Sequence, residues 1–173
     1  TSKSSSPGLQ AVIATLAVWA KQNHRNSICV ANVPSSDFDF LSSHRFIDKE
    51  PSTLVNISHW EQYDVTNLFS KGRSLSDIMR NEFGIRMLES NPAFNIGESD
   101  FSGNYKLVSP KHRHVESKPA DTVVDDVSWG WEKRIGAILK SSLVITDDID
   151  IAVISFLYGR RVVYDGPMGY LIP

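Results

Sequence analysis

The stretch that decides the fold runs from residue 143 to residue 165 and reads LVITDDIDIAVISFLYGRRVVYD. Two short runs rich in β-branched residues, 143–146 and 161–164, enclose an apolar segment that ends at Gly159. A glycine at such a point is the usual left-handed cap of a helix, so residues 149–158 are predicted to be helical. A strand–helix–strand unit of this kind is the βαβ crossover, which predicts that the two strands are parallel.

The rest of the chain supplies further helices and strands for the same sheet. Apolar side chains in 8–22 recur at helical spacing and predict an amphipathic helix. Two apolar runs, 27–33 and 53–57, predict additional strands. Ser74 has the character of a helix N-cap, and that helix is expected to stop at Gly84. The sequence therefore predicts an α/β fold with a Rossmann-like, largely parallel sheet flanked by helices.

Length and composition predict one domain. A chain of 173 residues with 41% hydrophobic and 22% charged residues is typical of a single globular unit. Residues 1–7 are rich in serine and predict a flexible lead-in, so the single α/β domain is expected to cover 8–173. Within it, 91–127 has scattered glycines and prolines and little periodicity, and it is predicted to be a long irregular segment.

Charge, cysteine content and hydropathy exclude several classes of protein. A net charge of −2 gives no reason to expect nucleic acid as a partner. The single cysteine, Cys29, excludes an intrachain disulfide, and it is expected to be a small buried hydrophobe. The apolar stretch 9–20 is too short for a transmembrane segment. One glycosylation sequon at Asn56 leaves the location open between the cytoplasm and the secretory lumen.

Metal and cofactor motifs give no positive prediction. His112 and His114 alternate in a basic, proline-bounded stretch, which is expected to be an exposed and metal-free loop. The sequence contains no phosphate-binding glycine loop, dinucleotide fingerprint, nucleophile elbow or zinc-protease motif. No cofactor is therefore predicted.

Acidic residues gather where the two predicted strands end. Asp147, Asp148 and Asp150 follow the first strand, and Asp165 follows the second. A helix start needs one capping carboxylate, and an Asx turn accounts for Asp165. Three acidic residues within four positions exceed what capping requires. A metal site, or a site for a sugar hydroxyl, at the carboxyl end of the sheet is the functional alternative.

Three stretches in this region resemble one enzyme family. They read WGWEKRIG at 129–136, LVITD at 143–147 and FLYGRRVVYD at 156–165, and HRFIDKE at 44–50 looks like a fourth. Together they resemble the polysaccharide pyruvyl transferases. The resemblance implies a fold like that of the GT-B glycosyltransferases and transfer of a pyruvyl group from phosphoenolpyruvate to a sugar. It also implies that Arg45 and Arg134 bind substrate.

Two positions differ from the family pattern, in which Thr-Asp is followed by Arg-Leu-His. Asp148 and Asp150 stand where the arginine and the histidine would be, which implies that the donor or the reaction differs. The leading hypothesis is a transferase-like domain that acts on a carbohydrate acceptor with phosphoenolpyruvate or a nucleotide sugar as donor. The alternative is a non-catalytic carbohydrate- or protein-binding domain, or one subunit of a larger assembly that requires another chain. The hypothesis assigns catalysis to Asp150, as general base, and Asp147, and substrate binding to Asp148, Asp165, Arg45 and Arg134, without a metal.

Overall fold

The computed structural model describes residues 6–24, 27–31, 39–48, 72–86, 90–113, 121–169 and 172. These residues form the α-helices α1 (Pro7–Asn23), α2 (Leu75–Phe83), α3 (Trp131–Lys140) and α4 (Ile149–Leu157). They also form the strands β1 (Tyr105–Val108), β2 (Thr122–Val124), β3 (Ser141–Thr146) and β4 (Arg161–Tyr164), and the short 3-10 helix η2 (Pro110–His112).

The strands form one four-stranded sheet in the order β2-β1-β3-β4, and every neighbouring pair is parallel. β3 and β4 pair directly, with Val144 opposite Val162, and α4 connects them. The predicted α/β, Rossmann-like fold and the parallel βαβ unit are therefore confirmed. Since all four strands run the same way, their carboxyl ends meet at one edge of the sheet.

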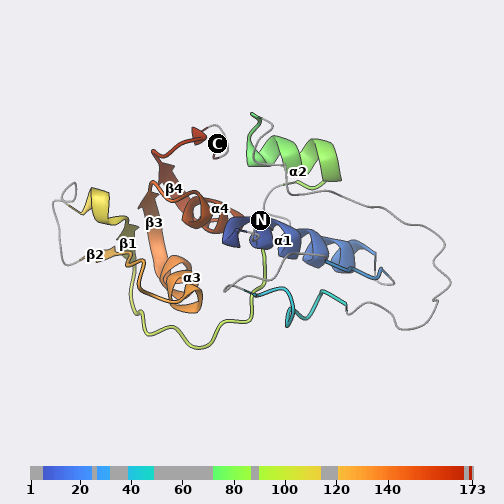
Figure 1. Cartoon of the computed structure of the whole chain (residues 1–173), viewed down its shortest axis with the longest axis horizontal. Coiled ribbons are helices and arrows are strands. Elements are labelled where there is room, and N and C mark those ends of the chain that lie inside the picture. Colours follow the sequence, from blue (N-terminus) through green and yellow to red (C-terminus); the bar gives the residue numbers. More distant parts are fainter. Residues whose placement is uncertain are drawn as a thin grey trace, which may run out of the picture.

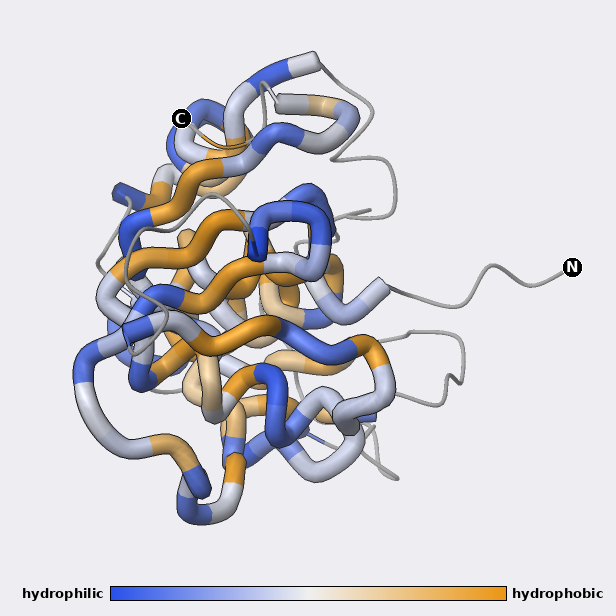
Figure 2. The backbone as a smooth tube through the Cα atoms, turned by 90° about the vertical axis from the view of Figure 1, so that its left-hand side faces the viewer, coloured by the Kyte–Doolittle hydropathy of each residue, from blue (hydrophilic) through white to orange (hydrophobic). Residues whose placement is uncertain are grey.

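The helices build the core on one side of the sheet. α3 and α4 pack against it and α1 packs against α4, so that three layers follow one another in Figure 1. Figure 2 looks from the side of β2 and shows the hydrophobic strand segments stacked one above another. α4 is the central element, and its interior residues are almost completely buried because it lies between the sheet and α1. The buried core includes Val12, Ile78, Leu107, Ile135, Ile138, Val144, Ile151, Ile154 and Leu157.

Helix ends agree with the signals in the sequence. The helix expected at 8–22 is α1, and Ser74 caps α2 by accepting a hydrogen bond from the backbone N–H of Asp77. Gly84 and Gly159 both have φ of 69°, as predicted for left-handed caps.

The cap after α4 has two backbone hydrogen bonds. The N–H of Gly159 donates to the carbonyl of Phe156, and the N–H of Arg160 donates to the carbonyl of Ser155. This is the Schellman arrangement, which satisfies carbonyls that the helix itself leaves open.

The prediction of a strand at 27–33 is wrong for the part of that segment that the structure describes. No strand forms in 27–31, where the backbone of Ser27 bonds to His24 and Lys21 and the backbone of Cys29 bonds to Asp48. The Asp48 carboxylate accepts from the backbone N–H of Cys29 at 2.8 Å and from the ammonium group of Lys21 at 2.6 Å. Residues 32 and 33, and the strand predicted at 53–57, lie outside the described residues.

The segment 91–127 is not irregular throughout, since it contains β1 and β2. These strands have four and three residues, which is too short for a pattern of alternating side chains to stand out. β1 is nevertheless an inner strand, paired on both sides. Its stability comes from partners distant in sequence, which local composition does not reveal.

Within the described part of the chain, no helix is both long enough and apolar enough to cross a membrane.

Candidate functional site

Polar residues follow all four strands at the carboxyl edge of the sheet. Ser109 follows β1, Asp125 follows β2, Asp147 and Asp148 follow β3, and Asp165 follows β4. Backbone hydrogen bonds extend the sheet by one residue there, from the Asp125 N–H to Val108, for example, at 2.8 Å. In a parallel sheet this edge is the usual place for a ligand, so we take it as the candidate site.

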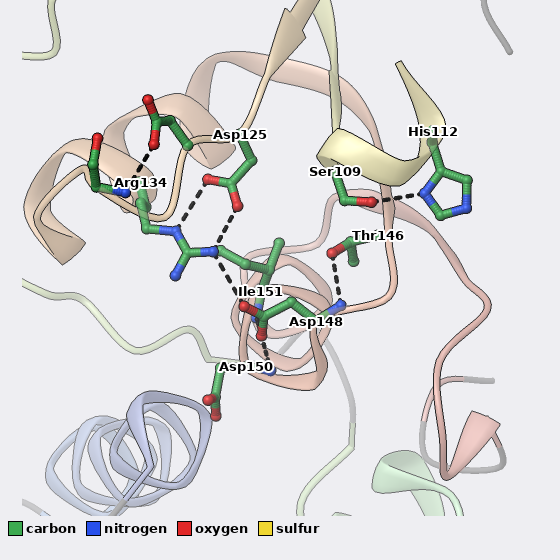
Figure 3. A network of polar contacts seen from close by, with 10 residues as sticks. Ser109, His112, Asp125, Arg134, Thr146, Asp148, Asp150 and Ile151 are labelled. Carbon is green, nitrogen blue, oxygen red and sulfur yellow. Dashed lines mark hydrogen bonds and ion pairs between the residues drawn. The ribbon is translucent and has the colours of Figure 1, made fainter. Parts of the chain in front are cut away.

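Arg134 links two of these strand ends. Its Nε and Nη2 donate to the two carboxylate oxygens of Asp125 at 3.0 and 2.5 Å, and Nη2 also donates to Asp148 at 3.1 Å (Figure 3). The ring of Trp131 lies 4.3 Å from the guanidinium carbon. Burial alone lowers the pKa of Arg134, but the hydrogen bonds and charges of Asp125 and Asp148 outweigh it and raise the pKa overall. The guanidinium is thus already paired with two carboxylates and joins α3 to the sheet.

Asp148 has two structural roles. One carboxylate oxygen accepts from the backbone N–H groups of Asp150 and Ile151, at 2.9 and 3.3 Å, and so caps α4. Its other oxygen accepts from Arg134 (Figure 3). The capping explanation of the acidic cluster is therefore confirmed for Asp148.

Asp150 belongs to the acidic cluster in sequence, but its carboxylate lies at the N-terminus of a different helix, α1. It accepts from the backbone N–H of Gly8 at 2.9 Å, in the first turn of α1, and Figure 3 shows it directed toward that helix. Burial raises the pKa of Asp150, although its hydrogen bonds from Gly8 and Ser6 lower it in part. A carboxylate at a helix N-terminus is stabilised by the free N–H groups and the helix dipole. Asp150 therefore joins α4 to α1.

A chain of hydrogen bonds joins Ser109, His112 and Asp165. Ser109 Oγ lies 2.8 Å from Nδ1 of His112, and Nε2 of the same ring lies 3.0 Å from Asp165 Oδ2. The prediction that His112 is exposed is wrong, since this side chain is only 12% exposed. His114 lies outside the described residues.

The burial of this Ser-His-Asp chain is opposite to that of a hydrolase triad. Ser109 is 3% exposed, whereas the Asp165 side chain is 45% exposed. A nucleophilic serine must reach its substrate, and the aspartate of a triad is the buried member. The hydrogen bond from His112, together with the charges of His112 and Lys111, lowers the pKa of Asp165. The solvent-facing group is thus a stable carboxylate and not a serine nucleophile.

Asp147 differs from its acidic neighbours. It is half-buried, and the contacts of the described residues include none made by its carboxylate. The turn after β4 packs closely on it, since a Cβ added to Gly166 would lie 2.5 Å from the Asp147 carbonyl oxygen. The junctions at Asp147 and Asp165 therefore lie side by side. Burial, and then the charges of Asp148, Asp147 and Asp165, raise the pKa of the adjacent Tyr164.

Arg45 is not part of this edge. It lines a cavity at the other end of α4, beside Tyr158 and Gly159. α4 has nine residues, and at ~1.5 Å per residue its two ends are roughly 13 Å apart. Of the predicted site residues, the structure brings together Asp147, Asp148, Asp165 and Arg134, and it places Arg45 elsewhere.

Sequence reasoning missed Asp125 and Ser109. Asp125 follows Val123 and Val124, a short β-branched run with an acidic end like the one at Asp147. This pattern of a short strand followed by an acidic residue was not recognised, because the surrounding segment 91–127 shows little periodicity. No group of three or more potential metal-ligating side chains occurs among the residues that the structure describes.

Comparisons with known proteins add no identification. No family model, no curated protein and no solved structure matches this chain.

Proposed function

We propose that this domain binds carbohydrate at the carboxyl edge of its sheet, with Asp147 and Asp165 accepting hydrogen bonds from sugar hydroxyls. Three observations carry the proposal: the strand ends at Asp147 and Asp165 lie side by side, the Asp147 carboxylate makes none of the contacts of the described residues, and the Asp165 carboxylate is exposed. Hydrogen bonds to an ionised acceptor are about twice as strong as those between neutral groups. Two carboxylates at adjacent strand ends therefore suit a ligand that carries several hydroxyl groups.

The same geometry favours binding over catalysis. A general base needs a raised pKa and access to the acceptor hydroxyl. Asp150 has the raised pKa, but its carboxylate holds the N-terminus of α1. Asp165 has the access, but its pKa is lowered. The two properties belong to different residues.

Transfer of a pyruvyl or glycosyl group is the second candidate function. The observation in its favour is the pair of basic side chains beside Asp165, where Lys111 Nζ lies 3.2 Å from the carboxylate and His112 Nε2 lies 3.0 Å from it. Such groups suit the phosphate of phosphoenolpyruvate or of a nucleotide sugar. Together with the resemblance at Thr146-Asp147, this observation makes group transfer the alternative that the experiments must separate from sugar binding.

Titration with neutral oligosaccharides, followed by calorimetry, tests the binding proposal. Asp147→Asn and Asp165→Asn keep the shape of the side chain but remove its charge, and each is expected to weaken binding roughly tenfold, about 1.4 kcal/mol. The matched control is Asp100→Asn, an exposed position that makes none of the side-chain contacts found among the described residues. Binding that is unchanged in both edge variants would refute the proposal.

A transfer assay separates the two candidate functions. Wild-type protein is incubated with an oligosaccharide and either phosphoenolpyruvate or a nucleotide sugar, and release of phosphate or nucleotide is measured. Turnover that falls about 100-fold or more in Asp150→Asn would identify a catalytic base and favour the transferase. Sugar binding without turnover of any donor would favour the binding domain.

A further inference from the structure

The cavity at the far end of α4 is the second place where polar groups converge. Its volume is about 280 Å³, just below the range of roughly 300–1,000 Å³ that is usual for ligand sites. Its apolar lining residues are Val18 from α1, Leu157 from α4 and Phe46. The remaining lining residues are Gln22, Arg45, Ser90, Asn91, Ala93, Tyr158 and Gly159.

The walls of this cavity are held in place by hydrogen bonds between distant segments. Nε2 of the buried His44 lies 2.7 Å from the carbonyl oxygen of Pro92, and this contact fixes the loop that carries Arg45. The backbone N–H of Phe94 donates to the Tyr158 hydroxyl at 3.0 Å. Three parts of the chain thus form one wall before any ligand arrives, which lowers the entropy cost of binding.

Two amide side chains in the cavity use their oxygen atoms within the protein, which leaves their N–H donors for a ligand. Asn91 Oδ1 accepts from the backbone N–H of Ala93 at 2.9 Å, and Gln22 Oε1 accepts from the Ser90 hydroxyl at 2.9 Å. In the contacts of the described residues, the amide nitrogens of both side chains have no acceptor.

Arg45 adds a positive charge to these donors. Its guanidinium lies 4.6 Å from the centre of the Phe46 ring, and none of the described contacts pairs it with a carboxylate. Among the described lining residues it is the charged one. A cavity lined by an arginine and two amide side chains is complementary to a carboxylate or a phosphate on a compact organic molecule.

We propose that this cavity is a second binding site, separate from the carboxyl edge, for a small organic anion whose carboxylate or phosphate is held by Arg45, Gln22 and Asn91. The size of the cavity fits a molecule no larger than a monosaccharide derivative. The site does not depend on the carbohydrate proposal, because the two lie at opposite ends of α4.

Three probes that share one ring test the charge requirement. Glucuronate and glucose 6-phosphate carry the two kinds of anionic group, and glucose carries neither. Calorimetric titration of the whole chain is expected to show binding of at least one anion at least tenfold tighter than that of glucose. The stronger of the two anions then identifies the source of the charge. Equal affinity for all three, or binding of neither anion, would overturn the proposal.

Variants locate the binding. Arg45→Gln is expected to weaken binding of the anion at least tenfold, whereas Arg86→Gln removes the same charge from an exposed position outside the cavity and is expected to leave it unchanged. Ser90→Leu keeps Arg45 but places bulk in the cavity, and it should also weaken binding. Thermal melts verify that each variant is folded. Unchanged affinity in Arg45→Gln would refute this site without bearing on sugar binding at the edge. Loss of anion binding in Asp147→Asn would also refute it, by placing the anion at the edge.

Discussion

The two ends of α4 use charge in opposite ways. At the N-terminal end, most carboxylates are paired: Asp148 with Arg134 and the backbone of α4, and Asp150 with the backbone of α1. At the C-terminal end the backbone is satisfied by the Schellman cap, and the guanidinium of Arg45 has no paired carboxylate among the described contacts. The acidic cluster that stands out in the sequence is therefore mainly structural. The group with capacity to bind an anion is an arginine on a distant loop.

Removing Arg134 is expected to have the largest effect on stability, because it breaks the link between α3 and the sheet. In Arg134→Met the carboxylate of Asp125, 4% exposed, would lose its buried counter-charge. Breaking one side of a buried ion pair costs about 3–5 kcal/mol. Urea denaturation measures the loss, and Arg73→Met in the surface pair with Glu82 is the control, with a loss below about 1 kcal/mol. Equal losses in both variants would show that the Arg134 link is not structural.

Adding a methyl group to Gly8 tests the contact between α1 and α4. The new Cβ would lie 2.8 Å from Asp150 Oδ1 and 3.3 Å from Asp150 Cα. Overpacking of this kind costs about 1–3 kcal/mol, which exceeds the helix preference of alanine. A net loss in the free energy of unfolding is therefore expected, whereas Gly97→Ala, with no atom within 4 Å, should change it little. A stabilised Gly8→Ala variant would contradict the close approach of Asp150 to α1.

The cap at the other end of α4 is expected to contribute less. Gly159 has φ of 69°, and alanine there should cost about 1 kcal/mol from the left-handed conformation. Gly84→Ala should lower the stability by a similar amount, since Gly84 has the same φ and a Cβ added there would meet no atom within 4 Å. A melting temperature unchanged in Gly159→Ala would show that the cap is not strained by a side chain.

Asp150→Asn is expected to produce a small difference that depends on pH. Burial raises the pKa of Asp150 in the folded protein above its ordinary value of 3.8. The folded state therefore favours the protonated form, and the stability from this group is lost as pH rises from about 3.8 through the raised pKa. Asparagine mimics the protonated acid and still accepts from Gly8. The two proteins should be equally stable at acidic pH, and the variant should be the more stable one near neutral pH. Wild type being more stable at neutral pH would reverse the inferred direction of the pKa shift.

The smallest effect is expected at Asp147. Because its carboxylate makes none of the described contacts, Asp147→Asn should change the free energy of unfolding by less than about 0.5 kcal/mol. The same variant should weaken sugar binding, as argued above. A large loss of stability in this variant would place Asp147 with Asp148 and Asp150 among the structural carboxylates.

Local signals in the sequence predicted the helices and the central βαβ unit. Pro7, Ser74, Gly84 and Gly159 fix helix ends by backbone geometry and short-range hydrogen bonds, so their effects can be read without the rest of the chain. The crossover from β3 through α4 to β4 follows from the apolar pattern of 143–164 for the same reason. The position of Asp147 and Asp165 at one edge then follows from the topology.

Tertiary structure alone decided the partners of the charged groups. Asp150 reaches Gly8, 142 positions away in sequence, and His112 reaches Asp165 across 53 positions. A strand as short as β2 forms because β1 offers it hydrogen bonds, whereas in 27–31 the backbone of Cys29 bonds to Asp48 instead. Such pairings depend on which segments meet in space, and a carboxylate's sequence neighbours do not determine whether a helix end, an arginine or solvent will face it.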